Sequence, residues 1–546
     1  MAEMKRTLTL TGITVNAMSF IAPGAFLWTT FQLQAAQAVG GVSTAGEMTT
    51  GLLFAIILAF LTAYSYAELA RIYPNAGAGS SYYYAEAALL DKDKPHLHKF
   101  ARITKVSLGW ISHLYYWIYP GIMVAFTAAL VGYMWTAITH QTLTFPMLAV
   151  IAVAFAILSG YIAFRGMSGS TNTALVITVI QLAAIAALFV FAIIYRVGHP
   201  AAHYEQASAL SIFIPHNLIN VLYQSTIAIL LLVGFESVTA LGAEAINPDR
   251  DIKLGVLISL AIQALLAHVA QYFAANFVIS DQTITATTAS GQHVAGFAAA
   301  AIDSAPLGTM ITNMVNQTFG GAGTAVAVLF AVTVLLALIG TTLACLNGGV
   351  RITYSMARDK EVPSILGLLH GQFATPHAGI WVLTAVSAAL GVYGVYSVDT
   401  VTQITLASNF GTFLVYGMTC IITIVAFTQR QDKHFFKHYA VPGVGFLMNL
   451  AMVAGIVYLA VVSGGATAND AWIAIGIVAV WIVIGIIWVV LNPATKGQKI
   501  LANPNVAEHE PGFAPVAQSL QSGPGHRPRP GVREGGACPR AAPAGR

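Results

Sequence analysis

Twelve apolar runs, each at least 20 residues long, constrain this chain more than any other feature of its sequence. About 20 apolar residues suffice for one helix to cross the hydrocarbon of a bilayer. Only 8% of the 546 residues are charged, whereas about 25% are charged in a soluble domain. The sequence therefore predicts an all-α integral membrane protein with about twelve transmembrane helices. The predicted spans are residues 8–37, 47–70, 105–139, 145–164, 171–196, 217–245, 254–279, 322–350, 377–397, 400–427, 442–463 and 471–491.

Lysines and arginines predict the orientation of these spans. An even number of spans places both termini on one side of the membrane. If that side is the cytoplasm, nineteen lysines and arginines near span ends lie inside and only Arg196 lies outside. Such an excess is typical of cytoplasmic loops. We therefore predict a multi-pass protein of the cell membrane, embedded in lipid, with both termini cytoplasmic, and the net charge of +4 gives no reason to invoke nucleic acid.

The segments outside the spans are short or poor in large apolar residues. Residues 1–7 are predicted to form a cytoplasmic N-terminus, and the first run lacks the cleavage motif of a signal peptide. Residues 77–91 are small and tyrosine-rich, which suits a short helix at the cytoplasmic surface. Residues 505–546 are rich in Gly, Pro and Ala and predict a disordered tail. The three cysteines show no paired spacing, so no disulfide or metal site is predicted.

The first apolar run contains a helix-breaking pair, Pro23 and Gly24, near its middle. Proline removes a backbone donor and glycine loosens a helix, yet unpaired backbone groups are least tolerable inside a bilayer. One interpretation is a passive kink, which is the usual role of proline in a transmembrane helix. The other is a functional interruption, which predicts a partner break in a second structural repeat.

A second interruption stands in the sixth run, where Gly234 is followed by Glu236 about ten residues from the nearest span end. An ionisable side chain at membrane depth costs several kcal/mol unless it is paired, protonated or solvated, and it is a functional candidate by default. The alternative is a structural glutamate bonded to a neighbouring helix. The separation of the two breaks is about five spans, as a repeat of five spans in each half requires.

Five segments stand in an order and spacing that resemble the motifs of one family. They are APGAF (22–26), AELARIYPNAGAGSSYYYAEA (67–87), GFES with EAINPDRDI (234–252), RITYSMARDKEVP (351–363) and TP (375–376). On these motifs the chain resembles the amino acid permeases of the amino acid-polyamine-organocation (APC) superfamily, over about residues 8–430. The resemblance implies a five-plus-five inverted repeat of residues 8–196 and 217–427, with broken helices one and six. Residues 442–491 would supply two further spans outside the repeat.

The interrupted helices predict a binding site for a zwitterion without any charged side chain. Unpaired N–H groups face the start of a half-helix and unpaired carbonyls face its end. The predicted N–H donors to a carboxylate are those of Gly24, Ala25 and Phe26. The predicted carbonyl acceptors for an ammonium group are those of Ile21, Ala22, Leu232 and Val233. Pro23 stands where the family usually has serine and lacks an N–H group, which leaves room for chiefly cationic substrates such as polyamines.

Side chains near the breaks supply the remaining predictions. Phe235, beside Gly234, is predicted to gate the substrate, with a core phenylalanine as the alternative. Glu236 is predicted to bind the coupling proton, because burial favours a neutral carboxyl group and a bound cation favours its charged form. Thr341 and Thr342 are an alternative sodium site, although threonines in membrane helices usually bond to their own helix. Protons or substrate exchange are favoured for coupling, and no other cofactor is predicted.

The resulting prediction is a secondary active transporter of amino acids or related amines that works by alternating access. A polyamine or organocation transporter is one alternative, and a non-transporting sensor with a transporter fold is another, because fold does not dictate function. A membrane enzyme lacks support, since no nucleophile motif or metal-ligand spacing is present in the sequence. The partners predicted are a small-molecule substrate and the bilayer, and no feature of the sequence sets an oligomeric state.

Overall fold

The computed structural model describes the chain in eleven segments: residues 8–21, 23–73, 80–90, 95–166, 171–199, 213–241, 245–281, 284–288, 290–373, 375–428 and 430–491. The predicted N-terminus 1–7, the predicted tail 505–546 and Ala22 lie outside the described residues. So do the side chains of Ile21 and of residues 23–26, whose backbone is helical.

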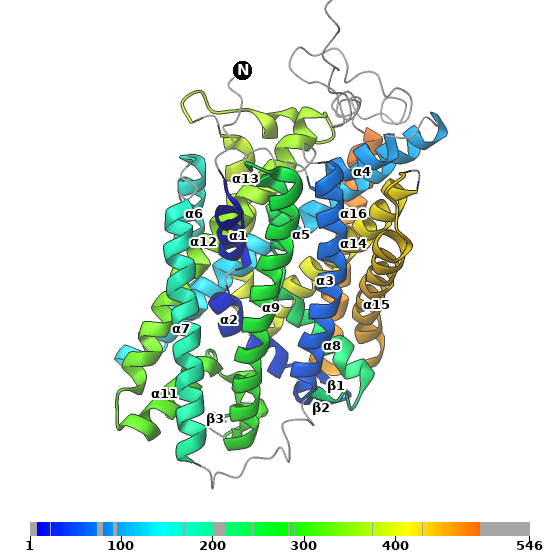
Figure 1. The fold of residues 1–546 in the computed structure, drawn as a ribbon. Helices are drawn as coiled ribbons and strands as arrows, with labels where there is room; N and C mark the ends of the chain where they lie inside the picture. The colour runs from blue at the N-terminus through cyan, green and yellow to red at the C-terminus, as the bar shows by residue number, and fades with distance from the viewer. Residues whose placement is uncertain are drawn as a thin grey trace, which may run out of the picture. The chain divides into compact units, whose positions relative to one another are not determined.

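The described residues are mainly helical, as the apolar runs predict (Figure 1). Ten of their helices are long and apolar enough to cross a membrane. These are α3 (Met48–Ile72), α5 (Pro95–Thr139), α6 (Phe145–Phe164), α7 (Thr171–Gly198), α9 (Pro248–Asp281), α12 (Gly323–Arg358), α13 (His377–Gly394), α14 (Val398–Phe427), α15 (Val441–Val462) and α16 (Gly465–Leu491). Two predicted spans, 8–37 and 217–245, are each described as more than one helical segment.

The first of these spans is described on both sides of its predicted interruption, while Ala22 itself lies outside the described residues. Helix α1 (Leu10–Ile21) precedes Ala22, and Pro23 is the first described residue of α2 (Pro23–Ala35). Proline suits this place because its fixed φ is helical and the first position of a helix needs no N–H donor. We call the junction between Ile21 and Pro23 the first break.

The second broken span is interrupted at residues 232–234, which we call the second break. Helix α8 (Leu218–Ala228) tightens into a 3-10 turn, η4 (Ile229–Leu231), before the break, and a longer 3-10 helix, η5 (Phe235–Leu241), follows it. Gly234 has a φ of +122°. A residue with a Cβ rarely adopts this conformation, so the glycine is required for the turn.

The two broken spans lie against each other in opposite directions. Helix α1 packs on η5, whereas α2 packs on η4 and on α8. The first half of one span therefore meets the second half of the other, and the two breaks come together inside the bundle. Around them, α5 packs on α12, α13 and α14, and α3 packs on α9 and α8.

Close approach of α3 to α8 depends on Gly51. A Cβ added to Gly51 would stand 2.4 Å from Cβ of Gln224 and 3.1 Å from its backbone carbon. Small residues of this kind allow transmembrane helices to approach closely. The contact holds the first half of span six against span two.

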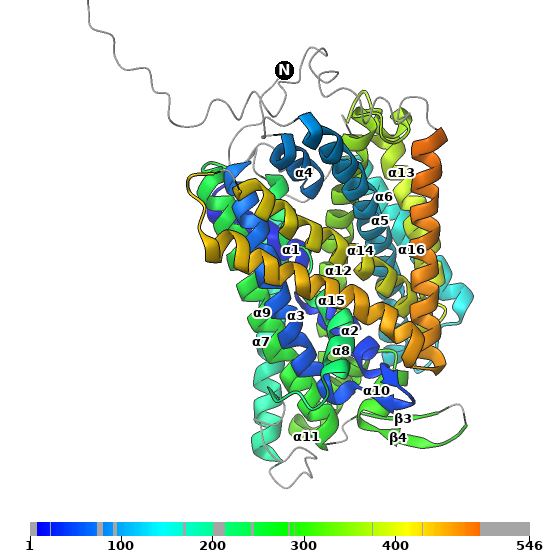
Figure 2. The ribbon, with the colours of Figure 1, turned by 90° about the vertical axis from the view of Figure 1, so that its right-hand side faces the viewer.

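Smaller elements occupy the two ends of the bundle. Helix α4 (Ser81–Leu90) lies near the top of Figures 1 and 2, and α11 (Pro306–Phe319) lies near the bottom. Helix α4 confirms the predicted short helix within residues 77–91. The remaining elements are β1 (Ala38–Val39), β2 (Val42–Ser43), η1 (Ala45–Glu47), β3 (Thr285–Thr287), β4 (His293–Ala295), α10 (Gly296–Ile302), η6 (Ser364–Gly367) and the π-helical η7 (Phe436–Ala440). The two strand pairs are antiparallel.

Ion pairs gather at the end of the bundle that contains α4, which we call the charged end. Glu68 accepts from Arg71 at 2.9 Å and also pairs with Lys253. Lys105 lies 2.6 Å from Asp359 at the end of α12. These pairs join α3 to α9 and α5 to α12, so they hold the helix ends together across the bundle.

Candidate functional site

Glu236 occupies the centre of the bundle, directly after the second break. Its side chain is buried, with 2% of its surface exposed. Oε1 accepts a hydrogen bond of 2.8 Å from the Tyr115 hydroxyl, and Oε2 accepts one of 2.8 Å from the Tyr416 hydroxyl and one of 3.1 Å from the Gly234 N–H. Hydrogen bonds to a charged acceptor are stronger than neutral ones. The carboxylate is therefore fixed between α5, α14 and its own backbone turn.

Aromatic rings surround this carboxylate. Phe235 is fully buried, and its ring lies 5.4 Å from that of Tyr416 and 6.1 Å from that of Tyr66, centroid to centroid. The Tyr66 and Tyr416 rings are themselves 5.9 Å apart and meet edge to face. Ring faces attract cations within about 6 Å of the centroid. A group of rings beside a carboxylate is thus suited to a positively charged ligand.

Phe235 lies where the sequence predicted a gate, beside the break and against two tyrosines. Its burial equally fits the alternative of a core phenylalanine, so the gating role stays a prediction.

A chain of hydroxyl groups leads from these rings to α4. The Tyr66 hydroxyl lies 2.6 Å from Oγ of Ser81, and Ser81 Oγ lies 2.8 Å from Oγ1 of Thr419. All three side chains are buried. The start of α4 is therefore bonded to the same tyrosine that packs on Phe235.

Two buried amides bind backbone carbonyls near the second break. Gln263 of α9 donates from Nε2 to the Leu231 carbonyl at 2.6 Å, and Asn409 of α14 donates from Nδ2 to the Thr226 carbonyl at 2.6 Å. Neither Oε1 of Gln263 nor Oδ1 of Asn409 has a hydrogen-bond partner among the described residues. Each of these two amide oxygens is therefore able to accept a further hydrogen bond.

The backbone groups predicted to bind substrate are placed as follows. Leu232 and Val233, whose carbonyls are predicted to accept from an ammonium group, lie at the second break, and their N–H groups both donate to the Ile229 carbonyl, at 2.9 and 3.1 Å. Gly24, Ala25 and Phe26 fall at the start of α2 as it is described, and the binding of a carboxylate by their N–H groups stays a prediction. The contact of α2 with η4 brings this turn near the second break.

Thr341 and Thr342 lie in α12, which packs on α1. Thr341 Oγ1 donates to the Ala337 carbonyl at 3.1 Å, and Thr342 Oγ1 donates to the Leu338 carbonyl at 2.6 Å. Each hydroxyl thus bonds to its own helix, as in the alternative to a sodium site. In the part of the chain that the structure describes, no three His, Cys, Asp or Glu side chains gather closely enough to hold a metal ion.

A family comparison accounts for this architecture. The family model described as amino acid permease matches residues 6–488. The chain belongs to this family. The permease is similar to the branched-chain amino acid permease BcaP of Bacillus subtilis (strain 168), with 22% identity over 453 residues, 82% of this chain and 86% of the relative.

Two further relatives carry different names. The methylthioribose transporter of Bacillus subtilis (strain 168) is 25% identical over 397 residues, 70% of the permease and 76% of the relative. The low-affinity putrescine importer PlaP of Escherichia coli (strain K12) is 23% identical over 487 residues, 87% of the permease and 93% of the relative. The named relatives are all transporters, and the permease is a multi-pass membrane protein of the same family.

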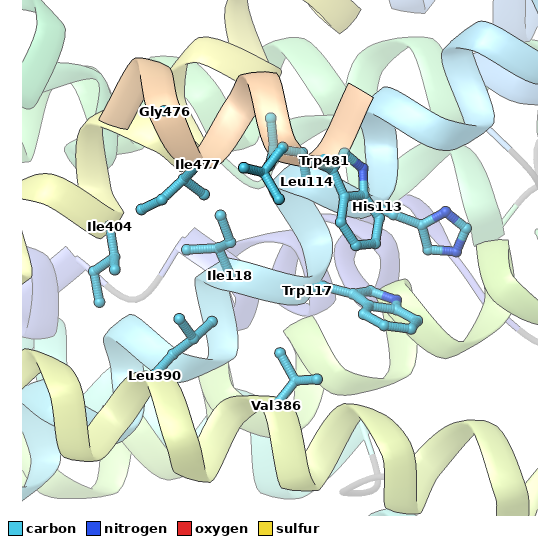
Figure 3. A pocket seen from close by; sticks show the side chains of 11 residues that line it. His113, Leu114, Trp117, Ile118, Val386, Leu390, Ile404, Gly476, Ile477 and Trp481 are labelled. Atoms are coloured by element: carbon cyan, nitrogen blue, oxygen red, sulfur yellow. The ribbon is translucent and has the colours of Figure 1, made fainter. Parts of the chain in front are cut away.

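A separate cavity of about 480 Å³ lies away from Glu236, between α5, α13, α14 and α16 (Figure 3). Its lining is apolar apart from His113, whose Nε2 lies 2.9 Å from Oγ1 of Thr353. His113 and Tyr115 are two residues apart in α5, which places them about 200° apart around the helix. Of these two span-three residues, Tyr115 therefore faces the carboxylate and His113 faces the apolar cavity.

Three residues of this region of the permease were not predicted from the sequence: Tyr66, Tyr416 and Gln263. Each is a polar residue inside an apolar run, which is the signal that singled out Glu236. Tyrosine is common in membrane helices, however, so Tyr66 and Tyr416 do not stand out. Gln263 carries the clearer signal, because a lone amide in the middle of span seven needs a partner.

Proposed function

We propose that this permease carries small substrates with an ammonium group across the membrane by alternating access, and that Glu236 couples transport to protons. The observation that carries the proposal is the buried Glu236 carboxylate, bonded to Tyr115 and Tyr416 at the junction of the two broken spans. Broken half-helices at the middle of a bundle are the usual substrate site of such transporters.

The described polar groups of the site favour a cation over an anion. Three buried acceptors belong to the sixth span or are bonded to it: the Glu236 carboxylate, and the amide oxygens of Gln263 and Asn409, whose nitrogens donate to the Leu231 and Thr226 carbonyls. Among the side chains that the structure describes, Lys105 is the only buried lysine or arginine, and it is bonded at the charged end. Pro23 also supplies no N–H group to a substrate carboxylate. We therefore propose that amines without a carboxylate are preferred.

The names of the relatives support both amino acids and amines as candidate substrates. One is named for branched-chain amino acids and another for putrescine, a diamine. Amino acids and amines share the ammonium group and differ in the carboxylate. The preference therefore depends on whether the first turn of α2 still binds a carboxylate without an N–H group at Pro23.

Matched substrate pairs test the preference. The full chain is reconstituted in proteoliposomes, and uptake is competed with lysine and cadaverine, ornithine and putrescine, and leucine and 3-methylbutylamine. Each pair differs only by a carboxylate. We expect the amine of each pair to compete more strongly. Stronger competition by the amino acids would overturn the amine preference alone, whereas absence of flux for the whole panel would overturn transport itself.

The proton role of Glu236 is tested by Glu236→Gln. Glutamine keeps an oxygen that accepts from Tyr416 and the Gly234 N–H, but it does not exchange a proton. We expect substrate binding to persist and the dependence of transport on pH to flatten. A pH profile equal to that of the unmodified permease would show that Glu236 is a structural carboxylate.

We also propose that the charged end is cytoplasmic and that both termini lie on that side. The excess of lysine and arginine in the loops of that end supports this orientation. A green fluorescent protein joined to the C-terminus is expected to fluoresce, because it folds in the cytoplasm. Activity of a C-terminal alkaline phosphatase fusion instead would reverse the orientation.

A further inference from the structure

A second buried carboxyl group, Glu361, lies at the charged end in contact with α4. The Tyr82 hydroxyl oxygen of α4 stands 2.7 Å from Oε2 of Glu361 and 2.7 Å from Oδ2 of Asp359. Lys105 of α5 stands 2.6 Å from the same Asp359 oxygen and 2.5 Å from Oε2 of Glu86. One ammonium group therefore serves a cluster that contains three carboxyl groups.

The two contacts of the Tyr82 hydroxyl require one more proton than the phenol supplies. A phenol has a single hydroxyl proton, so Tyr82 donates to one carboxylate and needs a donor for its other contact. Asp359 is bonded to the Lys105 ammonium and is therefore the carboxylate that accepts from Tyr82. The contact with Glu361 is then a hydrogen bond only if Glu361 carries a proton and donates it to the Tyr82 oxygen.

We propose that Glu361 is a second proton-binding site of the permease, and that its proton fastens α4 to the segment that follows α12. Losing that proton replaces a hydrogen bond by repulsion between Glu361 and Asp359. The backbone of Glu361 is held on its other side, because the Trp488 indole of α16 donates to its carbonyl at 2.7 Å. Ionisation therefore weakens the attachment of α4, which keeps its Tyr82–Asp359 and Glu86–Lys105 contacts.

The surroundings of Glu361 set its titration near neutrality. Burial raises the pKa of Glu361 to about 7. Lys105 lowers this pKa, whereas the charges of Asp359 and Glu86 raise it. Tyr82 faces the carboxyl group from α4, Lys105 from α5 and Asp359 from the end of α12.

Two cations flank Glu361 in its own segment. Arg358 lies over the Tyr354 ring, 5.7 Å from its centroid, and Lys360 is exposed. Lys105 is the cation whose bonds to Asp359 and Glu86 place it within the cluster.

Helix α4 connects this proton to the substrate site. Ser81, next to Tyr82 in sequence, is bonded to the Tyr66 hydroxyl at 2.6 Å and lies 2.8 Å from Thr419. The Tyr66 ring packs on Phe235 beside the second break. Release of α4 above neutral pH therefore loosens the wall of the substrate site from the cytoplasmic side. This regulatory consequence rests on the proposed transport function, whereas the proton site itself does not.

Infrared spectroscopy tests the proton site directly. The full chain in nanodiscs is titrated from about pH 6 to about pH 8 without substrate, and the carbonyl band of protonated carboxyl groups is followed. The titration is made in Glu236→Gln, so that the other proposed proton site does not contribute, and we expect a band that disappears with a midpoint near pH 7. This band should be absent when Glu361→Gln is added. A band with this midpoint in the double variant would overturn the assignment.

Cysteine labelling tests the release of α4. A reporter cysteine at Ser80, before α4, is introduced into a full chain whose native cysteines are replaced. Each labelling rate is divided by that of glutathione at the same pH, because the thiolate is the reactive form and its share rises with pH in any thiol. If only the ionised state exposes the cysteine, this ratio should rise about ninefold between pH 6 and pH 8, since a group of pKa 7 goes from about one-tenth to nine-tenths ionised. Glu361→Gln should abolish the rise of the ratio, and a rise of the ratio that survives would overturn the link.

A second variant, Tyr82→Phe, keeps the proposal testable if Glu361→Gln does not fold. It removes the hydroxyl and leaves Glu361 in place. We expect the infrared band to remain and the labelling ratio to glutathione to lose its pH dependence. A ratio that still rises with pH in Tyr82→Phe would show that the Tyr82 hydroxyl does not attach α4 to this segment. None of these readouts requires flux, so they are independent of the transport assay.

Discussion

Gln263→Met measures how strongly the second break depends on a side chain from another helix. Gln263 is fully buried and donates to the Leu231 carbonyl at 2.6 Å. Methionine keeps the volume and the unbranched shape but removes the donor. A buried carbonyl left without a partner destabilises a protein by about 1–3 kcal/mol. Loss of the unpartnered Gln263 oxygen offsets part of this, so we expect a decrease toward the lower end of that range.

The assay is thermal unfolding of the purified permease in detergent, with Ser259→Ala as the matched control. Ser259 is also fully buried on α9, but its hydroxyl bonds to the Val256 carbonyl of its own helix at 3.1 Å. The control should therefore unfold close to the unmodified protein. If Gln263→Met unfolds together with Ser259→Ala, the break does not depend on this amide.

The same variant probes substrate recognition. If Oε1 of Gln263 accepts from the substrate ammonium, Gln263→Met loses one charge-assisted hydrogen bond of about 1.5–3 kcal/mol. That corresponds to a Kd weaker by about 10- to 100-fold. An unchanged Kd for the preferred amine would remove Gln263 from the binding site and leave it a purely structural role.

Two further substitutions test packing and ion coupling. Gly485→Ala would place a Cβ 2.2 Å from Nε1 of Trp110 and should lower the free energy of unfolding by about 1–3 kcal/mol through overpacking. As a control on the same helix, the Cβ of Gly476→Ala would meet nothing within 4 Å, so this variant should have little effect in the same unfolding assay. Thr341→Val and Thr342→Val should transport as the unmodified permease does, both in Na⁺ and when Na⁺ is replaced by choline, because both hydroxyls bond to their own helix. A loss of Na⁺-dependent flux in either variant would restore the sodium site.

The helices of the bundle were predictable because membrane crossing imposes a length and a hydropathy on each of them. Their ends were not. Helix α5 begins at Pro95, ten residues before the predicted span at 105, and α12 continues to Arg358, eight residues past the predicted end at 350. Hydropathy marks where a helix meets the edge of the bilayer, whereas the helix itself continues into charged segments that water and ion pairs stabilise.

The breaks were predictable from local chemistry. A proline begins α2 and a glycine at φ +122° forms the turn after η4. The backbone conformations that these two residue types favour are known from the sequence alone. The side chains that bond to the backbone and to Glu236 at the second break were not predictable in this way. Gln263 lies about 30 residues after it and Tyr416 about 180 residues after it, so which of the many polar residues faces Glu236 depends on helix packing that a single sequence does not show.

Glu361 illustrates how such packing turns an ordinary loop residue into a titrating group, and its effect on stability has a definite sign. Its pKa rises from 4.5 to about 7 in the folded permease, so between these values the folded state holds a proton that the unfolded state has lost. The stabilisation is complete below pH 4.5 and is lost as pH rises through 7. A shift of this size corresponds to about 3 kcal/mol. The difference in unfolding free energy between the permease and Glu361→Gln should therefore change by about 3 kcal/mol from about pH 4 to pH 8. A difference that is constant with pH would show that Glu361 titrates like an exposed glutamate.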